Sequence, residues 1–355
     1  MSSDQGFPEI NYKEGDSFLN WGRSHGEEFK VAIKELVEIR RELMLQKNPR
    51  LISHLTRLAH EQFDVTKDFC PEICEELNGI AQGSDLTVED IVILNNYTDF
   101  RDIQLPEEGC STIHKKNEKV NVVGQTWDMH SSAKDYACVI KAPTQEHIPA
   151  SISFSLVGCV GMMGVNSNKL FTGVNNINTT NAKVGLIWPA LVRKCLMAID
   201  LDELRTILTT SPVTSGHNYI IADFNKGEHW EISPGIIEKV LDSEIDNHIF
   251  HTNHCLGPQT KEVEDKTSHS STTLPRFDIL TSKYDQVSSQ DEFIALLKSH
   301  EGYPKSICSH FESGAQDPSM TCGGGTFDFA TNDLHIWRGC KVHDKNYREY
   351  NYNLS

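Results

Sequence analysis

EEGCST, residues 107–112, is the short segment at which the texture of this 355-residue chain changes. Before it, residues 27–48 and three further stretches place apolar side chains at helical spacing with charged residues between them. After it, short runs such as 120–129 and 151–158 are rich in β-branched and aromatic residues and are bounded by glycine, proline or asparagine. The segment therefore separates a helical part from a strand-rich part.

The strand-rich part carries its own turn signals. Residues 219–233 predict a hairpin around Asn225-Lys226-Gly227, and residues 326–339 predict a second one around Asn332-Asp333. Helices are expected within 185–210 and 291–300. In the helical part, Thr87 and Asp90 have the spacing of a capping box, and Gly83 is the expected end of a helix from residue 71. Strands in meandering runs with helices segregated between them indicate an α+β fold.

Charge and composition exclude several classes of protein. Acidic residues outnumber basic ones by 50 to 33, so the formal net charge is −17, and no cationic surface is available for nucleic acid or anionic membranes. The start, MSSDQGFPEI, lacks the basic and apolar regions of a signal peptide, and no apolar run approaches the ~18 residues of a membrane span. We expect a folded cytoplasmic protein that binds neither nucleic acid nor membrane.

Ten cysteines are scattered through the chain, and their spacing predicts no metal site. The close pair Cys70 and Cys74 has no second pair of cysteines or histidines nearby, so neither a structural zinc site nor a disulfide framework is expected. His251 and His254 lie in a strand or loop without an evident third ligand, and we interpret them as packing or pocket-lining residues. We expect no metal and no cofactor, with most thiols reduced and buried.

Three residues suited to amide chemistry stand at the change of texture, shortly after it, and far downstream. Cys110 follows Gly109, Asp128 ends the segment GQTWD (124–128), and Asn253 lies in HTNHC (251–255). They offer a thiol nucleophile, a carboxylate to orient it, and a side-chain amide that donates to an oxyanion. The structural alternatives are a turn residue for Asp128 and a strand-end cap for Asn253.

Taken together, the motifs resemble the isopenicillin-N acyltransferase family of N-terminal-nucleophile (Ntn) hydrolases. They run in order through most of the chain: GRSHGEEF (22–29), Gly109-Cys110-Ser111-Thr112, GQTWD, GVNN (173–176), HTNHCL (251–256), STTLPRFDIL around Arg276, and GYPKSIC (302–308). The resemblance implies an αββα sandwich with a helical N-terminal pro-segment. Residues 1–109 would form an α chain and residues 110–355 a catalytic β chain, which stay associated as one co-folded domain.

The resemblance also implies self-cleavage between Gly109 and Cys110, and elementary chemistry agrees with it. Glycine tolerates a strained geometry at the bond to be cut. Cleavage would give Cys110 a free α-amine, whose ordinary pKa of about 7.7–8.0 suits it to accept the proton of its own thiol. By resemblance, Asp128 would orient Cys110, Asn253 would donate to the oxyanion, and Asn175 would bind substrate or oxyanion.

One departure from the family concerns Cys322-Gly323, which stands where penicillin-forming relatives have a Ser-Arg pair. Glycine cannot pair with a carboxylate, so penicillin-type recognition is not expected. The three glycines from Gly323 lack the motif of a phosphate loop and indicate a flexible or closely packed strand. The leading hypothesis is a self-processing amidohydrolase acting on a linear N-acyl or aminoacyl (β-alanyl) amide. An acyltransferase that uses an amine or a coenzyme A thioester is the first alternative, and an inert binding protein is the second.

Overall fold

The computed structural model describes residues 8–97, 99, 109–268, 272–310 and 319–354. Its N-terminal part is helical apart from one short strand, β1 (Glu9–Asn11), which the sequence did not predict. The helices here are α1 (Phe18–Glu28), α2 (Lys30–Lys47), α3 (Leu55–Phe69), α4 (Pro71–Ser84) and α5 (Val88–Asn95). The helices of the later part are α7 (Trp188–Cys195), α8 (Leu201–Thr210), α9 (Pro258–Glu262), α10 (Thr273–Lys283) and α11 (Gln290–Leu297).

The strands form two sheets. Sheet A has eight strands in the order β1-β4-β5-β6-β7-β8-β9-β10. Its members after β1 are β4 (Ala137–Ala142), β5 (Ser151–Leu156), β6 (Met163–Asn166), β7 (Phe171–Asn176), β8 (His217–Ala222), β9 (Gly227–Ser233) and β10 (Ile236–Asp242). Sheet B has six strands in the order β11-β2-β3-β12-β13-β14. They are β2 (Thr112–Lys116), β3 (Asn121–His130), β11 (Ile249–His251), β12 (Ser319–Asp328), β13 (Asp333–Arg338) and β14 (Arg348–Asn353).

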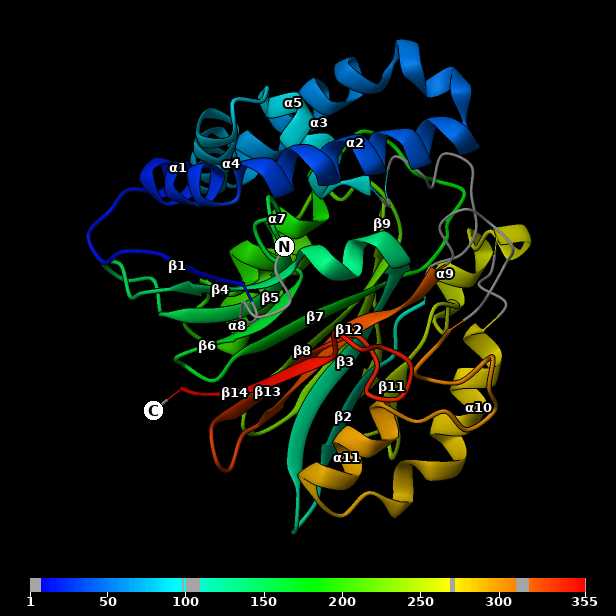
Figure 1. Ribbon diagram of the computed structural model, residues 1–355. Coiled ribbons are helices and arrows are strands. Elements are labelled where there is room, and N and C mark those ends of the chain that lie inside the picture. Colours follow the sequence, from blue (N-terminus) through cyan, green and yellow to red (C-terminus); the bar gives the residue numbers. More distant parts are fainter. Residues whose placement is uncertain (1–7, 98, 100–108, 269–271, 311–318, 355) are drawn as a thin grey trace.

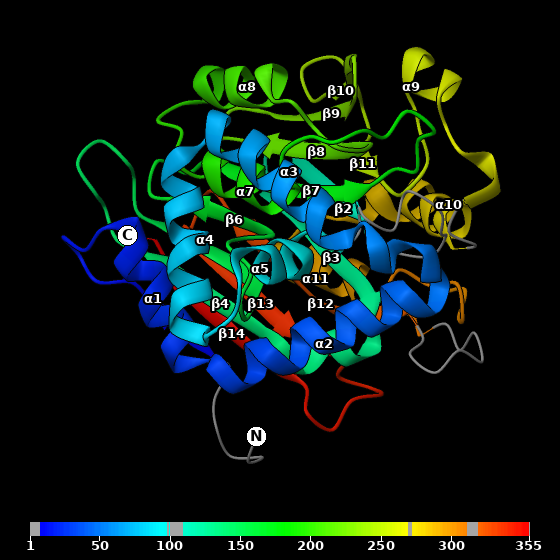
Figure 2. The same cartoon turned by 90° about the horizontal axis from the view of Figure 1, so that it is seen from above.

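Two hydrophobic cores show how these layers stack. The larger core joins α1–α5 and α7 to sheet A and to inward-facing residues of sheet B such as Trp127 and Phe327. The smaller core joins α10 and α11 to the outer face of sheet B through residues such as Ile113 and Phe293. Helices therefore cover both outer faces of two stacked sheets, as Figures 1 and 2 show, and the predicted αββα sandwich is confirmed.

The helices α1 and α4 pack through glycines spaced four residues apart. A Cβ atom at Gly22 would lie 1.9 Å from the carbonyl oxygen of Glu76, and one at Gly79 would lie 2.2 Å from that of Leu19. Gly26 and Gly83 repeat this arrangement one turn further along. Gly83 is thus a contact residue rather than the predicted helix end, because α4 continues to Ser84 and Asp85 forms a left-handed cap with φ of 52°.

Several local predictions are confirmed by the structure. Both hairpins form, β8 with β9 and β12 with β13, and Asn332 occupies a left-handed turn position with φ of 62°. Thr87 and Asp90 make the reciprocal hydrogen bonds of a capping box at the start of α5. In the described ranges, no helix combines the length and the apolar character needed to cross a membrane.

Candidate active site

Cys110 lies two residues before β2, the strand that pairs with β11. The register brings His251 of β11 opposite Thr112, so Asn253, two residues beyond the end of β11, lies beside Cys110. The backbone N–H of Cys110 donates to Oδ1 of Asn253 at 2.8 Å. Cys110 is only 5% exposed in this uncleaved chain. The nitrogen of the Gly109–Cys110 peptide bond is therefore held by the predicted amide residue.

Arg276, from the first turn of α10, closes the other side of the same junction. Its Nη1 donates to the carbonyl oxygen of Cys110 at 2.6 Å, and its Nη2 donates to Oδ1 of Asn253 at 2.7 Å. Complete burial lowers the pKa of Arg276, while the nearby Asp128 and Cys110 raise it. A cation thus lies within reach of the thiol that is expected to act as nucleophile.

The orientation of the Asn253 amide follows from these partners. Two donors, the Cys110 N–H and the Arg276 guanidinium, face one end of the amide, so that end must be the oxygen. Its Nδ2 donates to the carbonyl oxygen of Asn176 at 2.8 Å, and an NH₂ group has a second hydrogen to offer. The predicted role of Asn253 as an oxyanion donor therefore depends on that second hydrogen and stays a prediction.

Asp128 lies near the end of β3 and is 2% exposed. Its Oδ1 accepts a hydrogen bond from Oγ of Thr321 at 2.6 Å, across the pairing of β3 with β12. A Cβ atom placed on Gly109 would lie 2.6 Å from Oδ2 of Asp128 and 2.9 Å from Nη2 of Arg276. The junction residue must consequently be glycine if the carboxylate and the guanidinium are to stay where they are.

Asn175 belongs to β7 of the opposite sheet and reaches the site through β2. Its Oδ1 accepts from Oγ1 of Thr112 at 3.2 Å, and its Nδ2 donates to the carbonyl oxygen of Thr252. His251, behind it, lies 2.7 Å from Oε1 of the equally buried Glu231. In this state Asn175 ties the two sheets together beneath Cys110, and a substrate-binding role stays a prediction.

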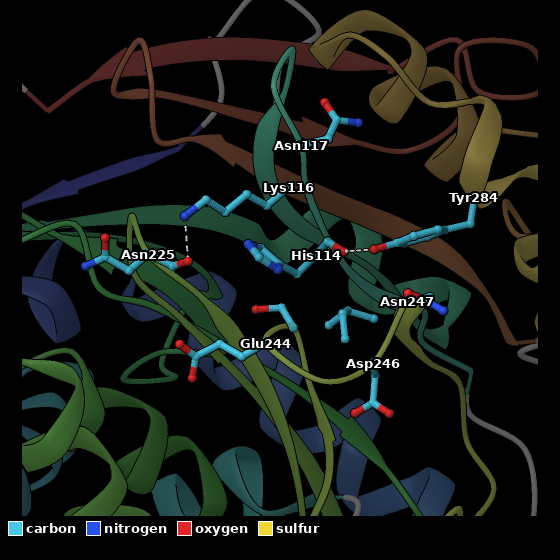
Figure 3. A pocket seen from close by; sticks show the side chains of 10 residues that line it. His114, Lys116, Asn117, Asn225, Glu244, Asp246, Asn247 and Tyr284 are labelled. Atoms are coloured by element: carbon cyan, nitrogen blue, oxygen red, sulfur yellow. Dashed lines mark hydrogen bonds between the residues drawn. The ribbon is translucent and has the colours of Figure 1, made fainter.

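A separate cavity of about 380 Å³ opens further along β2, past the side of His114. Figure 3 shows Lys116 reaching across it to the carbonyl oxygen of Asn225, at 2.6 Å, and the Tyr284 hydroxyl donating to that of His114, at 2.7 Å. None of the predicted site residues lines this cavity. The cavity is therefore separate from the Gly109–Cys110 junction.

The structure brings Cys110, Gly109, Asp128 and Asn253 together around one bond, although they are far apart in sequence. It adds Arg276 and Thr321, to which the sequence assigned no role. A signal for Arg276 was present, since an arginine in an apolar helix of a matched motif must find buried acceptors. Thr321 carried no such signal, because only strand pairing brings it to Asp128.

A thiol beside its own chain nitrogen, surrounded by an amide, a guanidinium and a carboxylate on an αββα sandwich, is the site of an acyl-transferring or amide-hydrolysing Ntn enzyme. The family description "Acyl-coenzyme A:6-aminopenicillanic acid acyl-transferase" matches residues 114–331, and the chain belongs to this family. The family expected from the motifs is thereby confirmed.

The chain is also similar to individual proteins. The chain is 26% identical over 300 residues to the acyl-coenzyme A:6-aminopenicillanic-acid-acyltransferase 40 kDa form of Emericella nidulans. The aligned region covers 82% of each protein. Among solved structures, a variant of conjugated bile acid hydrolase from Clostridium perfringens is 11% identical, covering 69% of this chain and 98% of that one with a TM-score of 0.44. The Caenorhabditis elegans N-acylethanolamine-hydrolyzing acid amidase ortholog is 10% identical, covering 61% and 92% with a TM-score of 0.42.

Proposed function

We propose that the chain is a self-processing cysteine amidohydrolase that cuts a linear amide through an acyl-enzyme on Cys110. The observation that carries the proposal is the junction itself. Asn253 holds the Cys110 nitrogen, Arg276 holds its carbonyl oxygen, and Asp128 lies against Gly109. Membership of an acyl-transfer family supports the same chemistry.

Self-processing would begin with attack of the Cys110 sulfur on the carbonyl carbon of Gly109. The C–N bond breaks as the nitrogen takes a proton, and Gly109 is left as a thioester on the sulfur. Water then hydrolyses the thioester, which gives a Gly109 carboxylate and a free Cys110 thiol and amine. The products are an α chain of residues 1–109 and a β chain of residues 110–355, of about 12 and 28 kDa.

Turnover would reuse the same atoms. The neutral α-amine of Cys110 takes the thiol proton, and the thiolate attacks the carbonyl carbon of the substrate amide. That proton passes to the departing amine, and water hydrolyses the acyl thioester. Asn253 supports this cycle by accepting an N–H of the α-amine, which leaves the amine lone pair for the thiol proton. The positive charge of Arg276 favours both a thiolate and a neutral amine.

Intact-mass measurement of freshly purified protein tests the processing step. We expect two fragments, with Cys110 as the new N-terminus, and a single 40.0 kDa chain for Cys110→Ala. Gly109→Ala should also stay unprocessed, because its methyl group would contact Asp128 and Arg276. A new N-terminus at any other residue, or a wild-type chain that stays whole and inactive, would contradict the proposal and favour the inert binding protein.

Acyl transfer is the second candidate, and the name of the family is the observation that favours it. Both reactions share the Cys110 thioester and differ only in whether water or an amine accepts the acyl group. Gly323 limits the likeness to penicillin chemistry, because a Cβ there would lie 2.5 Å from the Trp337 carbonyl oxygen and no arginine fits. The glycine run is thus a closely packed part of β12.

A screen of N-acyl and β-alanyl amides by mass spectrometry separates the two reactions. Hydroxylamine traps the acyl-enzyme as a hydroxamate, which identifies the acyl group. Added amines then compete with water for the acyl group, and coenzyme A thioesters are supplied as alternative acyl donors. If the free acid remains the main product at saturating amine, the chain is a hydrolase. Quantitative formation of the new amide would instead assign it as a transferase.

A further inference from the structure

Four potential metal ligands converge at the end of sheet B that lies beyond Asp128. His300 follows α11, Cys308 and His310 lie in the segment before β12, and Cys340 follows β13. Among the residues that the structure describes, they form the group of histidine, cysteine and acidic side chains whose ligand atoms all lie within 4.8 Å of one another. Cys308 and Cys340 are 2% and 3% exposed, so the sulfurs are shielded from bulk water.

Three of the separations within this group match the edges of a coordination tetrahedron. Nε2 of His300 lies 3.3 Å from Nε2 of His310, and Sγ of Cys308 lies 3.5 Å from the same nitrogen of His310. Sγ of Cys340 lies 3.3 Å from Nε2 of His300. For zinc bonds of about 2.0–2.1 Å to nitrogen and 2.3 Å to sulfur, tetrahedral geometry gives ligand–ligand distances of roughly 3.3–3.8 Å.

We propose that His300, Cys308, His310 and Cys340 bind one Zn²⁺ ion in a structural Cys₂His₂ site. Two thiolates and two imidazoles are ligands that zinc prefers in tetrahedral geometry, and four protein ligands leave no open position for substrate. On binding, each thiol loses its proton to solvent, so the two thiolates neutralise the charge of the ion.

The surroundings of the four residues suit such a site. The backbone N–H of Val342 donates to Sγ of Cys340 at 3.4 Å, an interaction that stabilises a thiolate. The ring of His343 packs against His310 with centroids 4.5 Å apart and lies 5.2 Å from His300, which fixes both imidazole planes. The metal would therefore bind ligands whose orientation is already set.

The same segment leads to the active site. Ser309, between the ligands Cys308 and His310, donates its backbone N–H to Oγ1 of Thr321 at 2.7 Å. Thr321 in turn donates to Asp128 at 2.6 Å. Zinc would thus fix the segment that positions the carboxylate at the junction, and losing the metal should loosen Asp128 without removing any reacting group.

Metal content of the full chain, purified under reducing conditions and reconstituted with equimolar Zn²⁺, tests the proposal. We expect one zinc per chain after gel filtration, and loss of that zinc in Cys308→Ser and Cys340→Ser. Cys195→Ala, which deletes a buried thiol of α7, and Cys110→Ala should keep it. His343→Asn should also keep it, because His343 is a packing neighbour and not a member of the group.

A spectroscopic measurement keeps the test independent of variants that fail to fold. Wild-type protein loaded with Co²⁺ should show thiolate-to-cobalt charge transfer in the near ultraviolet and the intense visible bands of tetrahedral cobalt. Zinc should protect Cys308 and Cys340 from alkylation in peptide maps. Substoichiometric zinc in the reconstituted wild type, a Cys308–Cys340 disulfide under reducing conditions, or metal retained by both serine variants would overturn the proposal.

Discussion

At the scale of single residues, the accepting and donating functions of the Asn253 side chain can be tested separately. Its oxygen accepts from Cys110 and Arg276, and its nitrogen has one hydrogen beyond the bond to Asn176. Asn253→Ala removes both functions and should lower kcat by about 10²–10³ with a smaller change in KM.

Asn253→Asp separates the two functions, because it keeps an acceptor for Cys110 and Arg276 but cannot donate to an oxyanion. If donation matters, steady-state kinetics should show Asn253→Asp nearly as slow as Asn253→Ala. A near-normal kcat in Asn253→Asp would make Asn253 a positioning residue only. A normal kcat with a raised KM in Asn253→Ala would make it a ground-state binding residue.

The residues that sequence could identify are those that stand in motifs resembling the family's. Cys110 after Gly109 and Asn253 in HTNHCL could be found, and they prove to be hydrogen-bonded neighbours. His300, Cys308, His310 and Cys340 could not be found, because their spacing fits no compact zinc motif and only loops and strand pairing bring them together. Long-range pairing is the information that local patterns lack.

At the scale of elements, the contact between α1 and α4 tests whether packing outweighs helix propensity. Gly79→Ala should stabilise α4 by about 0.5–1 kcal/mol if propensity alone acted. Its Cβ would instead lie 2.2 Å from the backbone of Leu19, and backbone atoms cannot move aside cheaply. We expect a net loss of about 1–3 kcal/mol in chemical denaturation.

Asn78→Ala, at the neighbouring position of α4, is the matched control and should be nearly neutral. Its side chain is half-buried, and truncating it to alanine brings no new atom against α1. A Gly79→Ala protein that is more stable than wild type would show that the two helices are not held at this close distance. The sign of the change in the free energy of unfolding distinguishes the two outcomes, whatever its size.

The buried pair between β9 and β11 predicts a pH dependence of stability. Burial alone would raise the pKa of Glu231, but hydrogen bonds from His251, Thr260 and the Leu256 backbone outweigh it and lower the pKa. A lowered folded-state pKa contributes stability that is complete above the unfolded value of about 4.3 and is lost as the pH falls through the folded value.

Thermal midpoints measured from about pH 6 downward should therefore fall more steeply in wild type than in Glu231→Gln, which does not titrate. The variant keeps an acceptor for His251 and should lose less stability at neutral pH than Glu231→Ala, for which removal of one partner of a buried pair costs about 3–5 kcal/mol. Parallel wild-type and Glu231→Gln profiles would exclude this pair as a source of the acid sensitivity.

At the scale of the whole molecule, the sequence predicted the layers better than the way they are joined. The change of texture at Cys110 indicated an α+β fold, and the resemblance to the family implied the αββα sandwich. It did not predict β1, whose three residues pair in parallel with β4 from Glu9↔Val139 to Asn11↔Lys141. Three residues are too few to show the alternation of a strand in the sequence. They nevertheless connect the N-terminal part of the chain to sheet A.

That joining predicts that the two chains stay together after cleavage between Gly109 and Cys110. Residues from both sides of the junction share one hydrophobic core. Within it, Nε of Arg193 in α7 lies 3.2 Å from Glu76 in α4, and both side chains are almost fully buried. Tyr12, just after β1, donates to the same carboxylate at 2.6 Å, so the contact joins α4, α7 and the segment after β1. Processed wild-type protein should elute as one species in native gel filtration and separate only in denaturant.

Glu76→Ala leaves the Arg193 cation buried without its partner, which costs about 3–5 kcal/mol. In processed protein this loss should make the two chains dissociate at a lower denaturant concentration. Native gel filtration and intact-mass measurement detect the dissociation. Glu9→Ala is the matched control, because the Glu9–Lys141 pair also joins the two chains at 2.7 Å but is about one-third exposed. It should cost no more than about 1 kcal/mol. Equal effects of the two variants would show that association does not depend on the buried pair, and separation of the wild-type chains without denaturant would contradict the single shared core.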